Sequence, residues 1–255
     1  MKIKIPYFSI ITVVKNDIKN IAKTIKSIKN QSFKNFEYLI IDGKSSDGTV
    51  EEIKKYKKCI HLIISEKDQG IYFAMNKGAK LARGKIIVFV NSGDTLKKDA
   101  LKKIYKKFLE NKKFDFIFGT VMRHYKTDSI LKFGYNINRL RYNFDFATAH
   151  STGFFLKKKI YNLIGNYNTK FKISADYDLY FRLYKKNLRG GYTKKNQKIG
   201  NMKSGGFSSK MSFFQHLIEE TKIRIHNSQN ILFVLLIFVN AIFKNFNKLF
   251  LQNKS

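Results

Sequence analysis

The chain has 255 residues, of which 44% are hydrophobic and 15% aromatic, so it can bury a core and is neither intrinsically disordered nor fibrous. Its 50 Lys and Arg residues against 18 Asp and Glu give a formal net charge of +32, which favours nucleic acid, an anionic membrane surface or a phosphate-bearing substrate as partner. The single cysteine, Cys59, excludes an intramolecular disulfide framework and a Cys-based zinc cluster. The first residues lead into a strand-like segment instead of a signal peptide, so we expect a cytosolic domain.

The basic residues are mostly Lys, and only seven are Arg. A lysine-rich composition is also what an AT-rich genome produces, whereas nucleic-acid-binding proteins rely on Arg forks and exposed aromatic side chains. The aromatic residues of this chain lie mostly within apolar runs, as is typical of a core. The charge alone therefore leaves open whether its origin is compositional or functional.

Short apolar runs alternate with segments of helical period over the first 119 residues. The runs are rich in β-branched and aromatic residues and predict buried strands at 7–14, 36–41, 61–64, 86–90 and 114–118. Between them, apolar residues spaced three and four apart predict helices at 18–28, 50–56, 71–81 and 99–109. This order predicts an α/β, Rossmann-like fold with a mostly parallel central sheet, helices on both faces, and ligands beyond the carboxyl ends of the strands.

The second half of the chain is less regular. A helix is predicted over 176–186, and a glycine–serine loop at 203–209 precedes a predicted helix over 211–226. Neither an internal repeat nor a linker rich in Pro or Gly marks a second domain. We therefore expect one main domain over 1–209, with halves at 1–119 and 120–209, and a helical tail over 210–255.

The tail contains a strongly apolar segment of thirteen residues at 231–243, with Lys222 and Arg224 before it and Lys244 and Lys248 after it. A helix needs about 20 apolar residues to span a bilayer, so this segment is too short. It fits either a buried core helix or a helix that lies in the membrane interface with basic anchors. Because the segment is terminal and the chain basic, we expect the second, with the protein peripheral to a membrane.

Polar clusters follow the predicted strands. Asp42 ends the second apolar strand, where a carboxylate can accept hydrogen bonds from a ribose hydroxyl or a base edge, although the Gly and Ser after it also fit an ordinary turn. Asp94 ends the cluster that comes directly after the fourth strand, and a buried acid is costly to leave unpaired. It either holds a divalent cation, which prefers carboxylate and phosphate oxygens, or caps the next helix.

The order of these clusters resembles the family 2 glycosyltransferases, and most of all the bacterial branch that builds colanic-acid-like polysaccharides and lipooligosaccharides. The resemblance covers residues 8–207. It depends on six motifs in sequence: the first strand with its loop at Thr12, Asp42-Gly-x-Ser-x-Asp-Gly-Thr49, Ser65-Glu-x-Asp-x-Gly-Ile-Tyr72, Met75-Asn-Lys-Gly78, Asn91-Ser-Gly-Asp94 and Ser174-Ala-Asp-Tyr-Asp178. It implies a GT-A fold and an inverting transfer from a nucleotide-diphospho-sugar, commonly a UDP-sugar, with Mg²⁺ or Mn²⁺.

The resemblance also implies roles for single residues. Asp94 matches the last acid of the family's DxD-type motif and would hold the metal, while Asp176 falls at the position of the catalytic base. The residues implied in donor binding are Thr12, Val14, Asp42, Asp68, Asn76, Lys77, Ser92, Gly93 and His150. His150 fits a structural role equally well.

Two motifs depart from the family pattern. Asn91 and Gly93 stand where the DxD-type motif has its other carboxylates. We therefore expect weaker metal binding, or Lys side chains that partly take the place of the metal. Ala175 stands before Asp176 where the family has an acid, and Asp176 also fits a helix cap. The glycine–serine loop at 203–209 fits either a lid over the diphosphate or a plain turn.

We therefore expect a nucleotide-sugar-binding half over 1–119, an acceptor-binding half over 120–209 and a membrane-associating tail. The expected acceptor is a bacterial surface glycan or a lipid-linked glycan at the cytoplasmic face of the inner membrane, and no nucleic acid is expected. Two other interpretations remain: a noncatalytic relative that binds a nucleotide sugar, and a basic nucleic-acid-binding module, which predicts salt-sensitive binding.

Overall fold

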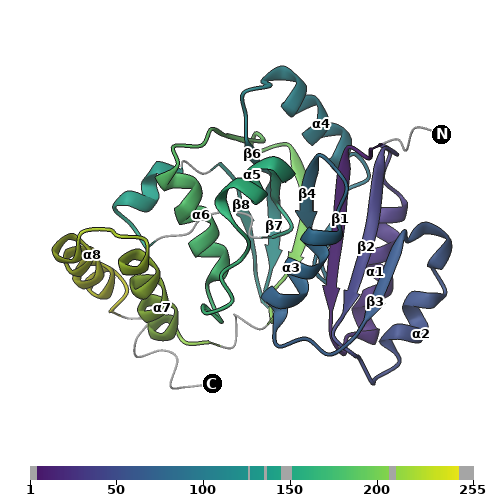
Figure 1. Cartoon of the computed structure of the whole chain (residues 1–255), viewed down its shortest axis with the longest axis horizontal. Coiled ribbons are helices and arrows are strands. Elements are labelled where there is room, and N and C mark those ends of the chain that lie inside the picture. Colours follow the sequence, from purple (N-terminus) through teal and green to yellow (C-terminus); the bar gives the residue numbers. More distant parts are fainter. Residues whose placement is uncertain (1–4, 126, 135–136, 145–150, 207–210, 247–255) are drawn as a thin grey trace.

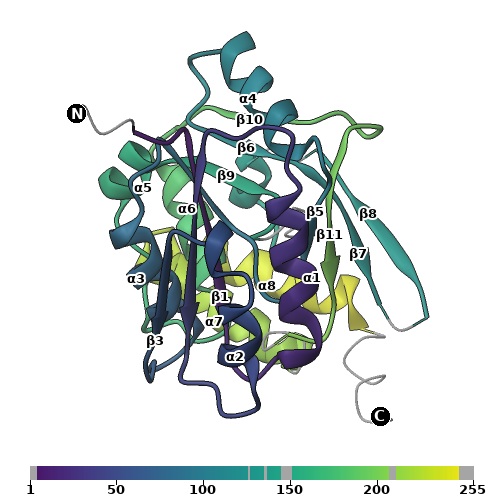
Figure 2. The same cartoon turned by 90° about the vertical axis from the view of Figure 1, so that its right-hand side faces the viewer.

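The structure is a computed structural model that describes residues 5–125, 127–134, 137–144, 151–206 and 211–246. Its centre is a seven-stranded sheet in the order β10-β6-β9-β4-β1-β2-β3 (Figure 1; β9 and β10 are labelled in Figure 2). The strands are β1 (Phe8–Val14), β2 (Phe36–Asp42), β3 (Leu62–Ser65), β4 (Ile86–Phe89), β6 (Phe116–Phe118), β9 (Phe154–Lys157) and β10 (Gly190–Tyr192).

The predicted parallel sheet is confirmed for β4, β1, β2 and β3, in which Phe8 pairs with Phe36 on one side and with Ile86 on the other. The whole sheet is mixed, however, because β9 runs antiparallel to both β4 and β6. A second, four-stranded sheet was not predicted from the sequence. It contains β5 (Thr95–Leu96), β11 (Lys198–Lys203), β7 (Thr120–His124) and β8 (Ser129–Lys132), in that order.

Helices cover both faces of the main sheet, as predicted. Figure 2 shows α1 (Ile18–Lys29) and α3 (Ile71–Leu81) on opposite sides of β1. The other helices are α2 (Thr49–Lys54), α4 (Ala100–Glu110), α5 (Lys158–Ile164), α6 (Ala175–Lys185), α7 (Phe213–His226) and α8 (Ile231–Lys244), with short 3-10 helices η1 (Lys57–Cys59) and η2 (Ile137–Arg141).

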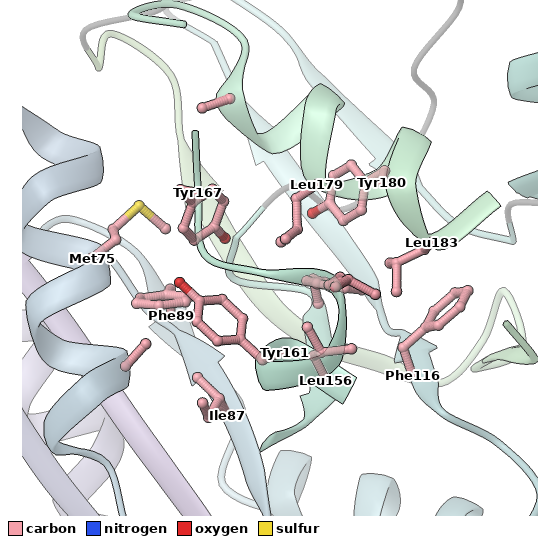
Figure 3. Close-up of a cluster of buried hydrophobic side chains, with 14 of the residues drawn as sticks. Met75, Ile87, Phe89, Phe116, Leu156, Tyr161, Tyr167, Leu179, Tyr180 and Leu183 are labelled. Carbon is pink, nitrogen blue, oxygen red and sulfur yellow. The ribbon is translucent and has the colours of Figure 1, made fainter. Parts of the chain in front are cut away.

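The core has two layers because successive strand side chains point to opposite faces. On β1, Ile11 packs into the layer under α3 and α6, whereas Ile10 packs into the layer under α1 and α4. Figure 3 shows part of the first layer, in which the side chain of Tyr167 lies between Met75 of α3 and Leu179 of α6. All seven residues of β1 are buried, as a strand covered on both faces requires.

A buried acid, Glu37, fixes the end of the sheet opposite to the strand ends that carry the polar clusters. Its carboxylate accepts hydrogen bonds from Ser9 Oγ (2.6 Å), from the backbone N–H and Nε of Arg83, and from the Gly84 N–H (3.2 Å). Burial alone would raise the pKa of Glu37, but the hydrogen bonds from Ser9 and Arg83 lower it below its usual value. The ionised form is therefore the one that stabilises the fold.

Glu37→Gln is expected to lower the free energy of unfolding at pH 7 by about 2 kcal/mol, because it removes charge-assisted hydrogen bonds. A lowered folded-state pKa gives stability that is present above the unfolded pKa of about 4.3 and is lost as the pH falls through the folded value. The difference in the free energy of unfolding between variant and wild type should therefore become smaller below about pH 4. Urea unfolding at pH 7 and pH 3.5 measures it, with the exposed Glu110→Gln as control; a difference independent of pH would contradict the assignment.

Candidate active site

The four parallel strands β1–β4 end at one edge of the sheet, and the loops that follow them are hydrogen-bonded to one another. Ser92 Oγ donates to Asp17 Oδ2 (2.7 Å), the Asp17 N–H donates to Thr49 Oγ1 (2.9 Å), and the Asn16 N–H donates to Ser45 Oγ (2.8 Å). These contacts join the loops after β1, β2 and β4. The predicted rim of polar clusters is therefore one connected surface, which we call the strand-end rim.

Asp42 lies at the end of β2 and is fully buried. Its carboxylate accepts from the Ser45 N–H (2.9 Å), from Ser45 Oγ (2.5 Å) and from Ser65 Oγ (2.6 Å). These bonds connect the loops after β2 and β3 and fix the carboxylate in the rim. The contact between Asp42 and a nucleotide stays a prediction.

Thr12 and Val14 shape the end of β1. Thr12 is fully buried, donates from Oγ1 to the Val90 carbonyl (2.8 Å) and shares a hydrogen bond with the Tyr38 hydroxyl (3.0 Å). The Val14 carbonyl accepts from the Gly43 N–H (2.8 Å). Both residues hold neighbouring strand ends together, and their contact with a donor is a prediction that these contacts do not test.

The loop after β3 carries a small charged cluster. Lys77 Nζ lies 2.6 Å from Asp68 Oδ1 and 2.6 Å from Glu66 Oε1. Burial would lower the pKa of Lys77, but its hydrogen bonds to the two carboxylates raise it, so the ammonium stays charged. Within the described residues, the other oxygen of Asp68, Oδ2, is buried without a hydrogen-bond partner, which leaves it available to a ligand donor.

The motif at 75–78 is largely used for packing. The Asn76 side chain accepts from the Tyr161 hydroxyl (2.8 Å) and the Tyr167 N–H (2.9 Å) and donates to the Tyr167 carbonyl (2.9 Å). A Cβ at Gly78 would lie 2.5 Å from Ile11 Cγ2, so glycine lets α3 approach β1. Asn76 therefore anchors the turn that contains Tyr167 on α3, and a donor contact for it remains a prediction.

Asp94 is 4% exposed in the turn between β4 and β5. One carboxylate oxygen, Oδ2, accepts from Thr152 Oγ1, and the other, Oδ1, accepts from the Lys203 N–H (2.9 Å). Burial raises the pKa of Asp94 to about 6, against the opposing effect of these hydrogen bonds and of Arg123. At neutral pH the carboxylate is ionised, which is the form that binds a cation.

Asn91 belongs to the same turn, because its carbonyl accepts from the Asp94 N–H (3.0 Å). Its side-chain Nδ2 donates to Ser151 Oγ (3.2 Å), whereas Oδ1 is buried without a partner in the described part of the chain. Gly93 takes φ +92°, a conformation that favours glycine, and its N–H donates to Thr24 Oγ1 (3.0 Å). The turn thus presents an ionised carboxylate and an unsatisfied amide oxygen, both of which suit a hard divalent cation.

Asp176 lies in the first turn of α6 and is partly exposed. Its Oδ1 accepts from the Tyr177 N–H (2.9 Å) and lies 3.4 Å from the Tyr72 hydroxyl, which also donates to the Ile173 carbonyl (3.0 Å). Burial, and then the charge of Asp176, raises the pKa of Tyr72 well above its usual range, so the hydroxyl keeps its proton. The first turn of α3, at the strand-end rim, therefore contacts the candidate base.

One predicted site residue, His150, lies outside the described residues. Asp178, which ends the last motif, is buried in an ion pair with Arg182 (2.8 Å). Beside Gly93 lies a cavity of about 360 Å³. Its lining is completed by Asn20, Lys23, Thr95, His124, Tyr125, Asn201, Met202, Lys203 and Ser204. Of these, only Lys203 and Ser204 belong to a segment considered for the site from the sequence, the glycine–serine loop at 203–209.

The sequence model described as Glycosyl transferase family 2 matches residues 9–188, which is well over half of the chain. The chain belongs to glycosyltransferase family 2. This confirms the family that the order of the motifs predicts.

Relatives of this family 2 glycosyltransferase include glycosyltransferases of two bacteria. The chain is 28% identical over 183 residues to a PGL/p-HBAD biosynthesis glycosyltransferase of Mycobacterium bovis, with 70% of each chain covered. It is 36% identical over 101 residues to TuaG of Bacillus subtilis, a putative teichuronic acid biosynthesis glycosyltransferase, with 38% of this chain and 40% of TuaG covered.

Solved structures share the fold. TarS residues 1–349 of S. aureus in complex with UDP matches with a TM-score of 0.70 and 18% identity, over 94% of this chain and 72% of that one. The mannosyltransferase PcManGT of Pyrobaculum calidifontis in complex with GDP-Man and Mn²⁺ matches with a TM-score of 0.64 and 15% identity, over 93% and 69%. At these identities the likeness shows the GT-A-like fold alone.

Three residues at the site of this family 2 glycosyltransferase were not predicted from the sequence. Tyr72 was part of a motif, but its contact with Asp176 depends on how α3 and α6 pack. Thr152 binds Asp94 from a position 58 residues later in the chain. Glu219 binds the segment before α6 from α7. No sequence signal identifies such distant polar pairs in a single chain.

Proposed function

We propose that this chain moves a sugar from a nucleotide-diphospho-sugar, with UDP as the expected nucleotide, to a hydroxyl group of a glycan acceptor, with inversion at the anomeric carbon. The observation that carries the proposal is the contact between the Tyr72 hydroxyl and Asp176 Oδ1 at 3.4 Å, because it joins the candidate base to the strand-end rim. The bound UDP and GDP-Man of the fold neighbours agree with a nucleotide-sugar donor.

In the proposed reaction, Asp176 takes the proton of the acceptor hydroxyl as its oxygen attacks the anomeric carbon. The bond between that carbon and the diphosphate oxygen breaks, and the nucleoside diphosphate leaves with the electron pair. Asp94 and Asn91 Oδ1 fit a divalent cation, Mg²⁺ or Mn²⁺, which would neutralise the charge that develops on the leaving diphosphate. Among the described residues no group of three or more His, Cys, Asp or Glu side chains forms a metal cage, so the donor's phosphates would complete the ligand set.

The donor is tested by thermal unfolding of the full chain in a panel of UDP- and GDP-sugars with and without Mn²⁺. A ligand that binds only the folded state raises its stability by about 2.7 kcal/mol at a hundred times its Kd. We expect stabilisation by a UDP-sugar that depends on the metal. The absence of a shift with every nucleotide sugar would overturn the proposal.

We also propose that α8 contacts an anionic membrane surface, where a lipid-linked acceptor would lie at the cytoplasmic face of the inner membrane. Among the described helices none is long and apolar enough to cross a bilayer. Val234 and Ile237 of α8 are buried, but five apolar side chains at helical spacing are 48% to 73% exposed. They are Leu232, Leu235, Leu236, Val239 and Phe243. This stripe, together with the net charge of +32, fits an interfacial helix.

Replacing Leu235 and Leu236 together by Asp is expected to weaken membrane binding roughly tenfold or more, because two apolar side chains no longer enter the lipid interface. Co-sedimentation of the full chain with phosphatidylethanolamine–phosphatidylglycerol (3:1) vesicles measures the change, and phosphatidylcholine vesicles test the need for anionic lipid. Leu163→Asp on α5, at a residue 62% exposed, is the matched control. Equal sedimentation of the double variant and the wild type would contradict the assignment.

A further inference from the structure

A carboxylate from α7 holds the segment that leads into α6. Glu219 Oε2 accepts from the backbone N–H groups of Ile173 (2.8 Å) and Ser174 (2.6 Å), and Oε1 accepts from that of Lys172 (3.0 Å). Three consecutive N–H groups therefore converge on one side chain. Charge-assisted bonds of this kind are shorter and stronger than neutral ones and fix direction as well as distance.

The same segment is held from two other elements. The Tyr72 hydroxyl of α3 donates to the Ile173 carbonyl (3.0 Å), and His216 Nδ1 of α7 lies 3.3 Å from Ser174 Oγ. Ser174 is the residue at which α6 begins, yet in the described structure its side chain makes no capping bond within the helix. The start of α6 is thus fixed from α7 and α3, two residues before Asp176.

We propose that Glu219 is a positioning residue for Asp176. It fixes residues 172–174 and thereby the direction in which the carboxylate of Asp176 points from the first turn of α6. This inference rests on the proposed function, since it gives Asp176 the role of base. An ionised carboxylate offers only acceptors and can satisfy three N–H groups at once, whereas an amide brings its own N–H groups against them. The role therefore needs Glu and is not filled by Gln.

The position of Glu219 extends the site beyond its predicted limits. It lies 45 residues after Ser174, beyond residue 188 where the family match ends, and beyond residue 209 where the main domain was predicted to end. Figure 1 shows α7 between α6 and α8, so the helix that positions the base lies beside the helix proposed to contact the membrane. The part of the tail formed by α7 would therefore belong to the acceptor-binding half.

The test is Glu219→Gln in the full chain, with the exposed Glu110→Gln as matched control. Hydrogen–deuterium exchange of the peptide that contains residues 172–174 should become roughly tenfold faster or more in Glu219→Gln and stay unchanged in the control. The turnover number should fall roughly 10- to 100-fold, as expected for a misplaced catalytic group, while the Kd of UDP with Mn²⁺ stays within about twofold. A fall in kcat without a change in UDP binding separates positioning from general damage to the fold.

Unchanged exchange in Glu219→Gln, or faster exchange with an unchanged kcat, would overturn the inference. Should Glu219→Gln fail to fold, Glu219→Asp replaces it, because it keeps the charge but withdraws the carboxylate by one methylene. A purely electrostatic role predicts that Glu219→Asp has the kcat of the wild type, whereas positioning predicts that its kcat is lower. If the wild type transfers no sugar, the proposed function and this role of Glu219 both fall, while the exchange data still report whether Glu219 holds the segment.

Discussion

Asp176→Asn is expected to lower kcat by roughly 10²- to 10⁴-fold, the usual contribution of a general base. Asn keeps the shape of the side chain and can still accept from the Tyr177 N–H, but it cannot take a proton from the acceptor hydroxyl. Because the proposed base would contact the acceptor and not the donor, the Kd of UDP with Mn²⁺ should stay unchanged. Single-turnover transfer from the donor found in the thermal panel measures the change in rate.

Asp99→Asn is the matched control for Asp176→Asn, because Asp99 pairs with Lys103 on the surface at the start of α4 and its side chain is 49% exposed. Transfer by Asp176→Asn at the wild-type rate would show that another group is the base. A wild-type chain that binds donor but never transfers it would instead favour the noncatalytic interpretation. Salt-sensitive binding to nucleic acid that neither substitution changes would favour the nucleic-acid-binding module.

Asp94→Asn is expected to abolish most of the metal-dependent stabilisation by UDP, which is about 2.7 kcal/mol for wild type at a hundred times its Kd. The neutral amide removes the negative charge that attracts the cation, while Asn91 Oδ1 alone is a weak ligand. The substitution also places an amide beside the Lys203 N–H or Thr152, so the variant is expected to lose stability without ligand.

For that reason the measured quantity is the shift between unfolding with and without UDP and Mn²⁺ within the same variant, with Asp99→Asn treated in the same way. UDP without metal serves as the second reference, because it separates loss of the cation from loss of the nucleotide. A full metal-dependent shift in Asp94→Asn would mean that Asp94 does not hold the cation.

The first half of the fold could be predicted closely because its strands are continuous apolar runs. The predicted helix at 71–81 matches α3 at both ends, and the predicted strand at 7–14 differs from β1 by one residue. The second sheet could not be predicted. β5 has only two residues, and β8 has only four, of which two are polar and the first two are exposed.

The antiparallel direction of β9 could not be predicted from the sequence either. Its residues, Phe154–Lys157, form another short apolar run, and their place between β4 and β6 is decided by pairing with strands far away in the chain. Local pattern gives the presence of a strand, but its neighbours in the sheet depend on the packing of the whole domain.

At the site, the positions of the polar clusters in the sequence predicted the strand-end rim, but not the hydrogen bonds that each side chain makes. Asp42 and Asp94 follow parallel strands, so their common edge was predictable. Nothing in the sequence predicts that Ser45 and Ser65 donate hydrogen bonds to the Asp42 carboxylate, or that the Asn76 side chain is hydrogen-bonded to the backbone of Tyr167. These bonds form only once the loops meet, as does the contact of Glu219 with residues 172–174.

The central claim is that the strand-end rim and Asp176 form one nucleotide-sugar site, and a crystal structure of the full chain with UDP and Mn²⁺ tests it most directly. We predict that the cation binds Asp94 and the diphosphate together, that the nucleoside lies over the ends of β1 and β2, and that the β-phosphate faces the carboxylate of Asp176. UDP bound away from the turn of Asn91 and Asp94, or with its β-phosphate directed away from Asp176, would contradict the account.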